Sequence, residues 1–87
     1  MALSDDFTAA QAKVKTLPKT PDASELLELY ALFKQATVGD VSGDRPGMLD
    51  FKGRAKYDAW AGKRGGSKDG AMQSYVALVE KLAAKYG

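Results

Sequence analysis

The chain contains no cysteine and no histidine among its 87 residues. Without cysteine there can be no disulfide, no thiol nucleophile and no thiolate metal site. Without histidine, the commonest general base, the commonest metal ligand and the Ser/His nucleophile pair are also missing. These two absences argue against most enzyme mechanisms. We therefore predict a protein with no catalytic residues, no metal site and no cofactor.

Long apolar runs are missing as well. No segment approaches the ~20 apolar residues that a membrane-spanning helix needs, and residues 1–6 lack the basic and then apolar layout of a signal peptide. We therefore expect a cytoplasmic protein with no integral membrane association. At 9.3 kDa, with 45% apolar and 28% charged residues, residues 1–87 fit a single soluble domain with one modest core.

The charge is small in total but unevenly distributed. A net charge of +2 is too low for a sequence-independent nucleic-acid binder, which needs a concentrated basic face. Residues 52–68 nevertheless hold six cations against the single acid Asp58, a local excess of +5 that leaves −3 for the rest. One region is therefore electropositive on the scale of a few phosphates.

Apolar residues recur at steps of three and four, and strand-like alternation is absent, so the sequence predicts helices only. With Pro18 ending the first helix and Gly39 the second, four helices joined by two short connections and one long one indicate an all-α bundle. The expected helices are a first that starts at a Ser4 cap, a second from Ala23 to Val38 capped by Asp22, a third from Gly53 to Ala61 or Lys63, and a fourth capped by Ser67.

We also predict which side chains of the second helix and of the loop after it are buried. A stripe along the helix, consisting of Leu26, Leu29, Phe33, Ala36 and Thr37, should face the core. The segment from 39 to 52 has three glycines, one proline and no periodicity, which predicts a long loop. We expect this loop to be held down by its own apolar side chains, namely Met48, Leu49 and Phe51.

Several familiar sites can be discarded. The glycines between Gly39 and Gly47 lack the spacing and the following Lys-Ser or Lys-Thr of a phosphate-binding loop. Asp40, Asp44 and Asp50 lack the spacing of a calcium loop, and we interpret them as turn formers. Trp60 is interpreted as a core anchor.

Tyrosine and lysine form the remaining candidate site. Tyr30, Phe33 and Lys34 share one helix face, an aromatic pair beside a cation. Phosphates favour cations and tyrosine hydroxyls, and a purine favours aromatic stacking, so the mixture suits a nucleotide. The alternative is that the tyrosines are half-buried core residues and the lysines only solubilise the surface. The candidates are Lys15, Tyr30, Phe33, Lys34, Lys52, Lys56 and Tyr75.

Three segments of the chain carry a specific resemblance. They are Lys34-Gln-Ala-Thr-Val-Gly-Asp40, Arg45-Pro-Gly-Met-Leu-Asp-Phe51, and Gly53 with Ala55-Lys56 and Asp58-Ala-Trp60. Together they resemble the signature of the acyl-CoA-binding proteins, and the likeness extends from Phe7 to the closing Lys85-Tyr-Gly87.

The resemblance implies a four-helix bundle of up-down-down-up topology that binds medium- to long-chain fatty acyl-CoA with high affinity. It implies an intracellular carrier and pool former for lipid metabolism, not an enzyme, expected to be a monomer with transient contacts to acyl-CoA-using enzymes. By position, Tyr30, Lys34, Lys56 and Tyr75 match residues that hold the adenine and the ribose 3′-phosphate. Lys15 and Lys52 match further contacts to the coenzyme head group.

The chain departs from the family pattern at Phe33, Thr20 and Tyr57, the last of which replaces a frequent tryptophan. Phe33 stands where many relatives have tyrosine, so stacking is retained but a hydroxyl contact is not. Thr20 occupies a place often held by lysine, a charge that Lys19 could replace. As a hypothesis, the acyl chain lies in an apolar groove near Ala10, Leu26 and Leu27.

Two other functions remain as alternatives at this point. A mixed aromatic and basic face beside an apolar groove would also serve a protein-interaction module that binds a partner helix. An acyl-CoA thioester hydrolase is the other, although without histidine or cysteine its catalyst would have to be an unusual carboxylate.

Overall fold

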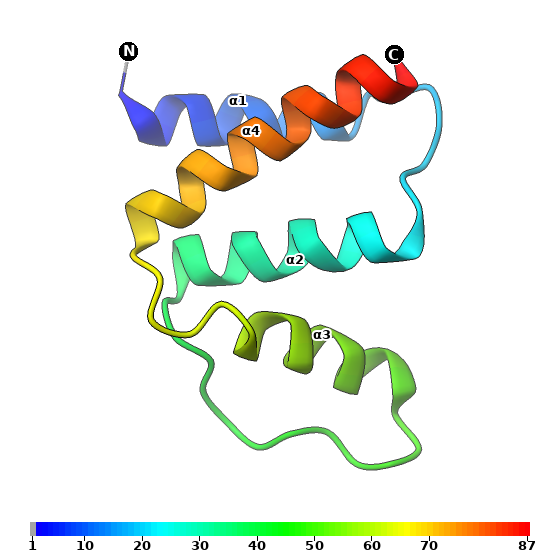
Figure 1. Cartoon of the computed structure of the whole chain (residues 1–87), viewed down its shortest axis with the longest axis vertical. Coiled ribbons are helices and arrows are strands. Elements are labelled where there is room, and N and C mark those ends of the chain that lie inside the picture. The colour runs from blue at the N-terminus through cyan, green and yellow to red at the C-terminus, as the bar shows by residue number, and fades with distance from the viewer. Residues whose placement is uncertain (1) are drawn as a thin grey trace.

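The computed structural model describes residues 2–87, and these form four helices and no strand. Followed along the colour bar in Figure 1, α1 and α4 run in one direction and α2 and α3 in the other. The predicted all-α bundle of up-down-down-up topology is confirmed. The helices are α1 (Leu3–Val14), α2 (Ala23–Thr37), α3 (Phe51–Ala61) and α4 (Lys68–Tyr86).

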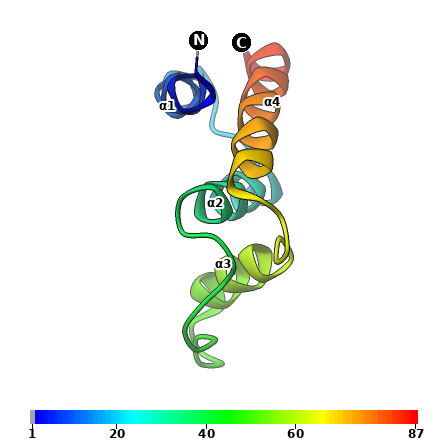
Figure 2. The same ribbon diagram turned by 90° about the vertical axis from the view of Figure 1, so that its left-hand side faces the viewer.

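The helices pack in a chain rather than around one axis. α4 packs against both α1 and α2, whereas α3 packs against α2 alone among the helices of residues 2–87. Figure 2 shows α2 between α4 and α3, and the molecule measures 37 × 28 × 15 Å along its principal axes. The core lies between α1, α2 and α4, and its largest buried apolar side chains are Phe7, Leu29, Leu32, Tyr75, Val79 and Leu82.

Two of the predicted helix caps are present. The Asp22 carboxylate accepts a hydrogen bond from the Glu25 amide at 2.9 Å, and the Glu25 carboxylate accepts one from the Asp22 amide at 3.0 Å. This reciprocal pair is a capping box, which satisfies two of the free amides at the start of α2. At the start of α4, the Ser67 hydroxyl accepts from the Gly70 amide at 2.9 Å.

The other two helices begin earlier than predicted. α1 starts at Leu3 with Ala2 as its N-cap, and Ser4 lies inside the first turn, where its carbonyl accepts from the Thr8 hydroxyl at 3.0 Å. The Ser4 cap was therefore a wrong prediction. α3 starts at Phe51 because the Asp50 carboxylate accepts from the amide of Gly53 at 2.9 Å, so that glycine lies in the first turn and not at the boundary.

The core face of α2 is rotated from the predicted stripe. Leu29 and Ala36 are buried as expected, and Phe33 is half-buried against the core. Leu26, however, is 44% exposed and Thr37 is exposed. Both positions lie on the flanks of the helix, because the buried face also includes residues 31, 32 and 35, which pack toward both α4 and α3.

The apolar side chains of the long loop do not hold it down. Met48 is 76% exposed, Leu49 92% and Phe51 77%, so the predicted apolar packing of this segment is wrong. Polar contacts to α3 replace it. The Arg45 guanidinium donates to both carboxylate oxygens of Asp58 at 2.9 and 2.7 Å, and the Tyr57 hydroxyl donates to the residue 43 carbonyl at 3.1 Å.

A buried glutamine joins the two loops that flank α3. The Gln35 side-chain amide is 1% exposed and donates to the Asp40 carboxylate at 2.9 Å and to the Gly66 carbonyl at 2.7 Å. The same carboxylate accepts from the Gly65 amide at 2.9 Å. The hydrogen bond from Gln35 is the main reason that the pKa of Asp40 is lowered. Asp40 therefore joins the loop after α2 to the turn that follows the C-terminal end of α3.

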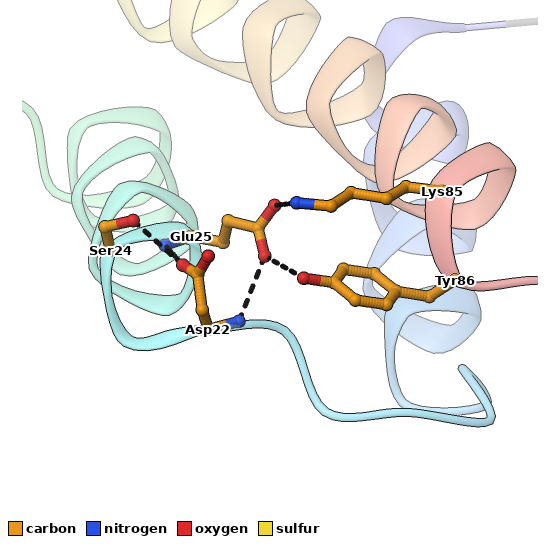
Figure 3. A network of polar contacts seen from close by, with 5 residues as sticks. All are labelled: Asp22, Ser24, Glu25, Lys85 and Tyr86. Atoms are coloured by element: carbon orange, nitrogen blue, oxygen red, sulfur yellow. Dashed lines mark hydrogen bonds and ion pairs between the residues drawn. The ribbon is translucent and has the colours of Figure 1, made fainter.

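A second network ties the end of α4 to the start of α2 (Figure 3). The Glu25 carboxylate accepts from the Tyr86 hydroxyl at 2.5 Å and from the Lys85 ammonium at 2.9 Å. These two hydrogen bonds, with the one from Tyr86 contributing most, lower the pKa of Glu25 from 4.5 to about 2. One carboxylate thus serves as part of a helix cap and as the contact between two helices that are distant in the sequence.

Glu25→Gln is expected to lower the urea midpoint of unfolding at pH 7, because the amide keeps the shape and loses the charge. Since the pKa of Glu25 is lower in the folded chain, its contribution is fully present above pH 4.5 and is lost as the pH falls toward about 2. The difference from the parent protein should shrink over that interval. Glu80→Gln is the matched control, because Glu80 is exposed and forms no ion pair within residues 2–87. Equal midpoints for the parent and Glu25→Gln at pH 7 would contradict this role.

Trp60→Ala is expected to lower the free energy of unfolding by about 3–5 kcal/mol, as for other large buried aromatics. The indole is 7% exposed, and its Nε1 donates to the Gly39 carbonyl at 2.7 Å. Trp60→Phe keeps most of the apolar packing and loses only that hydrogen bond, so it should cost about 1–2 kcal/mol. Urea denaturation measures both values. A loss for Trp60→Ala no larger than that for Trp60→Phe would show that the indole is not an anchor.

Candidate functional site

Two cavities adjoin along α2 and share part of their walls. The first, of about 440 Å³, lies where the end of α1 and the linker after it face α2, and we name it the linker pocket. The second, of about 330 Å³, lies between α2 and α3, and we name it the α2–α3 pocket. Tyr30 and Leu26 line both cavities. The two pockets are therefore neighbours separated by those two side chains.

The linker pocket combines cations with aromatic rings. Lys15 and Lys19 line it from the exposed linker side, and Tyr30, Phe33 and Tyr75 line it from the helices. Neither lysine forms an ion pair within residues 2–87. Two unpaired ammonium groups beside three aromatic rings are the groups that bind a phosphate and a flat heterocycle.

Phe7, a buried residue of α1, packs against two of the aromatic rings that line the linker pocket. Its ring is stacked on Phe33 with centroids 6.0 Å apart, and the edge contact to Tyr75 has centroids 5.0 Å apart. Tyr75 is only 5% exposed, and burial raises the pKa of its phenol, so the side chain is a neutral hydroxyl at pH 7. Such a hydroxyl can donate a hydrogen bond to an anionic oxygen.

The α2–α3 pocket is largely apolar. Leu26 and Leu27 line it from α2, and Phe51 and Ala55 line it from the start of α3. Lys52 and Lys56 stand at the same wall, and neither forms an ion pair within residues 2–87. α2 and α3 run in the same direction, so their N-terminal ends lie on the same side of the molecule (Figure 1). An apolar cavity with cations beside it can hold a hydrocarbon chain whose polar end is anionic.

Two cation–aromatic contacts cross from α2 to α3, one helical turn apart. The Lys56 ammonium lies 5.4 Å from the centroid of the Tyr30 ring, and the Lys34 ammonium lies 4.9 Å from the Trp60 centroid. In the first contact α2 supplies the ring, and in the second it supplies the cation. Each such contact is worth about 0.5–1 kcal/mol at an exposed site. These contacts orient Tyr30 and Lys56 at the shared wall.

The structure divides the predicted site residues into groups. Lys15, Tyr30, Phe33 and Tyr75 meet in the linker pocket, whereas Lys52 and Lys56 lie in the adjoining α2–α3 pocket. Lys34 lines neither cavity, because its side chain extends over Trp60.

The structure does not bring Ala10 together with the two leucines of α2 in one cavity. Leu26 and Leu27 line the α2–α3 pocket, but Ala10 is buried between α1 and α4 beside Val76 and Val79. Ala10 is thus a core residue in this structure.

Sequence reasoning missed Phe51 and Ala55 as pocket residues. Phe51 was assigned to packing of the loop, since the third helix was expected to begin at Gly53. With α3 beginning at residue 51, the two residues are four positions apart and share a helix face. The signal that could have found them is the Asp50 cap, which sets the helix start.

Within residues 2–87 no cluster of acidic side chains could hold a metal ion. None of the helices in this part of the chain is long and apolar enough to cross a membrane. The charged groups at the two pockets are cations, so the site is suited to an anionic ligand that also carries apolar surface.

Comparison with known proteins identifies a family that matches most of the chain. Residues 4–79 match the family described as acyl CoA binding protein. The chain is 60% identical to acyl-CoA-binding protein homolog 1 of Caenorhabditis elegans over 93% of its own length and 94% of that relative. It is 52% identical to the acyl-CoA-binding protein homolog of Drosophila melanogaster, with 97% and 98% of the two chains covered.

Solved structures extend the agreement to the fold. The crystal structure of Oryza sativa acyl-CoA-binding protein 2 superposes with a TM-score of 0.92 at 43% identity and covers 97% of this chain and 93% of that one. That of the homologous protein from Moniliophthora perniciosa gives a TM-score of 0.84 at 43% identity, covering 99% and 92%. With matching sequence, fold and length, this chain belongs to the acyl-CoA-binding protein family.

Proposed function

We propose that the protein binds medium- to long-chain fatty acyl-CoA and acts as an intracellular carrier and pool former for that ligand. The observation that carries the proposal is the pair of adjoining pockets, one cationic and aromatic, the other apolar, which share Tyr30 and Leu26. Acyl-CoA has the same two parts, a phosphorylated nucleotide and a hydrocarbon chain. Family membership supports this ligand independently.

In the proposed complex, the linker pocket holds the nucleotide end. The adenine packs against Tyr30 and Phe33, and the Tyr75 hydroxyl and the Lys15 ammonium contact phosphate oxygens. Lys19 lines the same pocket next to Thr20 and adds a second cation. Lys34 contributes only if its ammonium leaves the Trp60 ring, which a phosphate can favour because a charge-assisted hydrogen bond is stronger than the aromatic contact.

The acyl chain lies in the α2–α3 pocket. Leu26, Leu27 and Phe51 supply the apolar wall, and Lys52 and Lys56 stand beside its mouth, where they face the phosphate end of the ligand. Each buried methylene contributes ~0.8 kcal/mol, so a chain of several methylenes outweighs any single polar contact. Free coenzyme A should therefore bind far more weakly than its thioester, and free fatty acid should lack the cationic anchor.

Membership of a binding-protein family supports a carrier and not an enzyme. A carrier must leave the thioester intact and must release the ligand to the enzymes that use it. We further propose that the protein is a cytoplasmic monomer that meets those enzymes transiently. The alternative of an interaction module is less well supported, because a partner helix would use the apolar pocket and leave the free lysines of the linker pocket without a role.

Calorimetric titration with palmitoyl-CoA should give tight one-to-one binding, and coenzyme A and palmitate alone should each bind much more weakly. The thioester should survive incubation with the protein for hours, as measured by chromatography. Loss of the thioester would favour the hydrolase. Failure of palmitoyl-CoA to bind would favour the interaction module.

Tyr75→Phe is expected to weaken acyl-CoA binding by about tenfold, the value of one hydrogen bond to a charged group. The midpoint of thermal unfolding should not fall, because burial alone accounts for the raised pKa of Tyr75 and no hydrogen bond within residues 2–87 uses its hydroxyl. Tyr57→Phe is the matched control with the opposite pattern. It loses the hydrogen bond to the Gly43 carbonyl but lines neither pocket, so stability should fall slightly and affinity should not change. Unchanged affinity in Tyr75→Phe would remove Tyr75 from the site.

A further inference from the structure

Three large apolar side chains project from the end of the molecule where α2 and α3 begin. Met48 is 76% exposed, Leu49 92% and Phe51 77%, and we name these three residues the apolar tip. Contiguous exposed apolar side chains of this size are uncommon on a soluble surface and mark a site of contact. The polar contacts of Arg45 and Tyr57 hold the loop without using these residues, so the tip has no packing role in the fold.

The apolar tip is continuous with the mouth of the α2–α3 pocket. Phe51 belongs to both, since it lines the pocket and remains largely exposed. Met48 and Leu49 line neither pocket and precede Phe51 by three and two residues in the chain. A hydrocarbon chain that enters the pocket past Phe51 therefore starts from the surface at which the tip projects.

The charges around the tip are mainly positive. Lys52 and Lys56 follow it on α3, and neither forms an ion pair within residues 2–87. The only acid between the tip residues is Asp50, whose carboxylate accepts from the Gly53 amide as the cap of α3. Unpaired lysines beside exposed apolar residues are the combination by which proteins bind the surface of an anionic bilayer.

We propose that the apolar tip inserts into the surface of an anionic lipid bilayer, with Lys52 and Lys56 at the headgroups, and so brings the mouth of the α2–α3 pocket to the membrane. The proposal rests on the proposed function, because a membrane is where an acyl-CoA with its hydrocarbon chain partitions. Side chains that are three-quarters or more exposed project from the surface. Projecting side chains suit insertion into the soft boundary of a bilayer better than contact with a rigid protein groove.

Flotation with vesicles tests the proposal on the ligand-free protein. The parent chain should float with phosphatidylcholine vesicles that contain phosphatidylserine, and less with phosphatidylcholine alone or in high salt, because the lysine contribution is electrostatic. The double variant Met48→Ser, Leu49→Ser should partition at least about tenfold more weakly, since two exposed apolar side chains are lost. Val38→Ser is the matched control, an aliphatic residue 49% exposed at the opposite end of α2, and should bind as the parent does.

Solution affinity separates this proposal from the proposed function. Calorimetry with octanoyl-CoA, a thioester that stays monomeric, should give the same affinity for the double variant and the parent, because neither substituted residue lines a pocket. Parent protein that binds octanoyl-CoA but never floats would overturn the membrane proposal and leave the carrier intact. Equal flotation of the double variant and the parent would overturn it too, as would flotation independent of phosphatidylserine.

A fluorescence measurement locates the insertion. Trp60 is the one tryptophan of the sequence and is buried, so Leu49→Trp adds a single exposed indole at the tip. Its emission should shift to the blue on addition of phosphatidylserine vesicles and should be quenched by lipids brominated on their acyl chains. Emission unchanged by vesicles to which the variant floats would show that another surface makes the contact, and would overturn the assignment to the tip.

Discussion

The arrangement of the site depends on the packing of α3 against α2 alone. α1, α2 and α4 share an apolar core, but α3 buries only Trp60 and has no second helix to pack on within residues 2–87. Contacts of other kinds hold it in place. The Tyr30–Lys56 and Lys34–Trp60 contacts cross to α2, and the hydrogen bond from Trp60 to the residue 39 carbonyl joins it to the loop. A helix held this way leaves its N-terminal end apart from the core, and the α2–α3 pocket occupies that end.

The parts of the fold that the sequence predicted are those specified by local signals. α2 and α4 have side-chain caps at Asp22 and Ser67 and long apolar periodicity, and their bounds agree with expectation. The errors arose where a short polar residue had several possible partners. Ser4 could have capped α1, but the helix begins two residues earlier than that cap would set it, and the Ser4 carbonyl accepts from the Thr8 hydroxyl instead. Asp50 was interpreted as a turn former, although its carboxylate sets the start of α3.

The loop before α3 shows that residue type alone does not predict which side chains are buried. Three apolar residues in a long loop favour burial on average, but here they are exposed, and polar contacts of Arg45 and Tyr57 hold the loop to α3 instead. Gln35 is the reverse case. A polar residue flanked by the apolar face of α2 is buried since Asp40 and Gly66 supply acceptors from two separate loops. Long-range partners of this kind leave no pattern in the sequence.

The candidate site was predictable where its residues lie on one helix and not where segments meet. Helical spacing grouped Tyr30 with Phe33, and both line the linker pocket. The same spacing added Lys34, but a flexible side chain takes the direction that its neighbours favour, and the neighbour here is the Trp60 ring of α3. Ala10 was hypothesised to share a groove with the leucines of α2, whereas the packing of α1 on α4 places it beside Val76 and Val79. The sequence thus identified residues of the candidate site, but only the tertiary structure shows how they divide between the two pockets.

That division constrains the proposed complex. Because Tyr30 and Leu26 line both pockets, the part of an acyl-CoA that joins nucleotide to hydrocarbon must cross these two side chains. Binding of one end then places the other end beside its own pocket, and the second contact forms within the same molecule at a high effective concentration. Coenzyme A and fatty acid as separate molecules lack this advantage even where each makes all of its own contacts. The predicted preference for the intact thioester therefore follows from the shared wall as well as from the sum of the polar and apolar contacts.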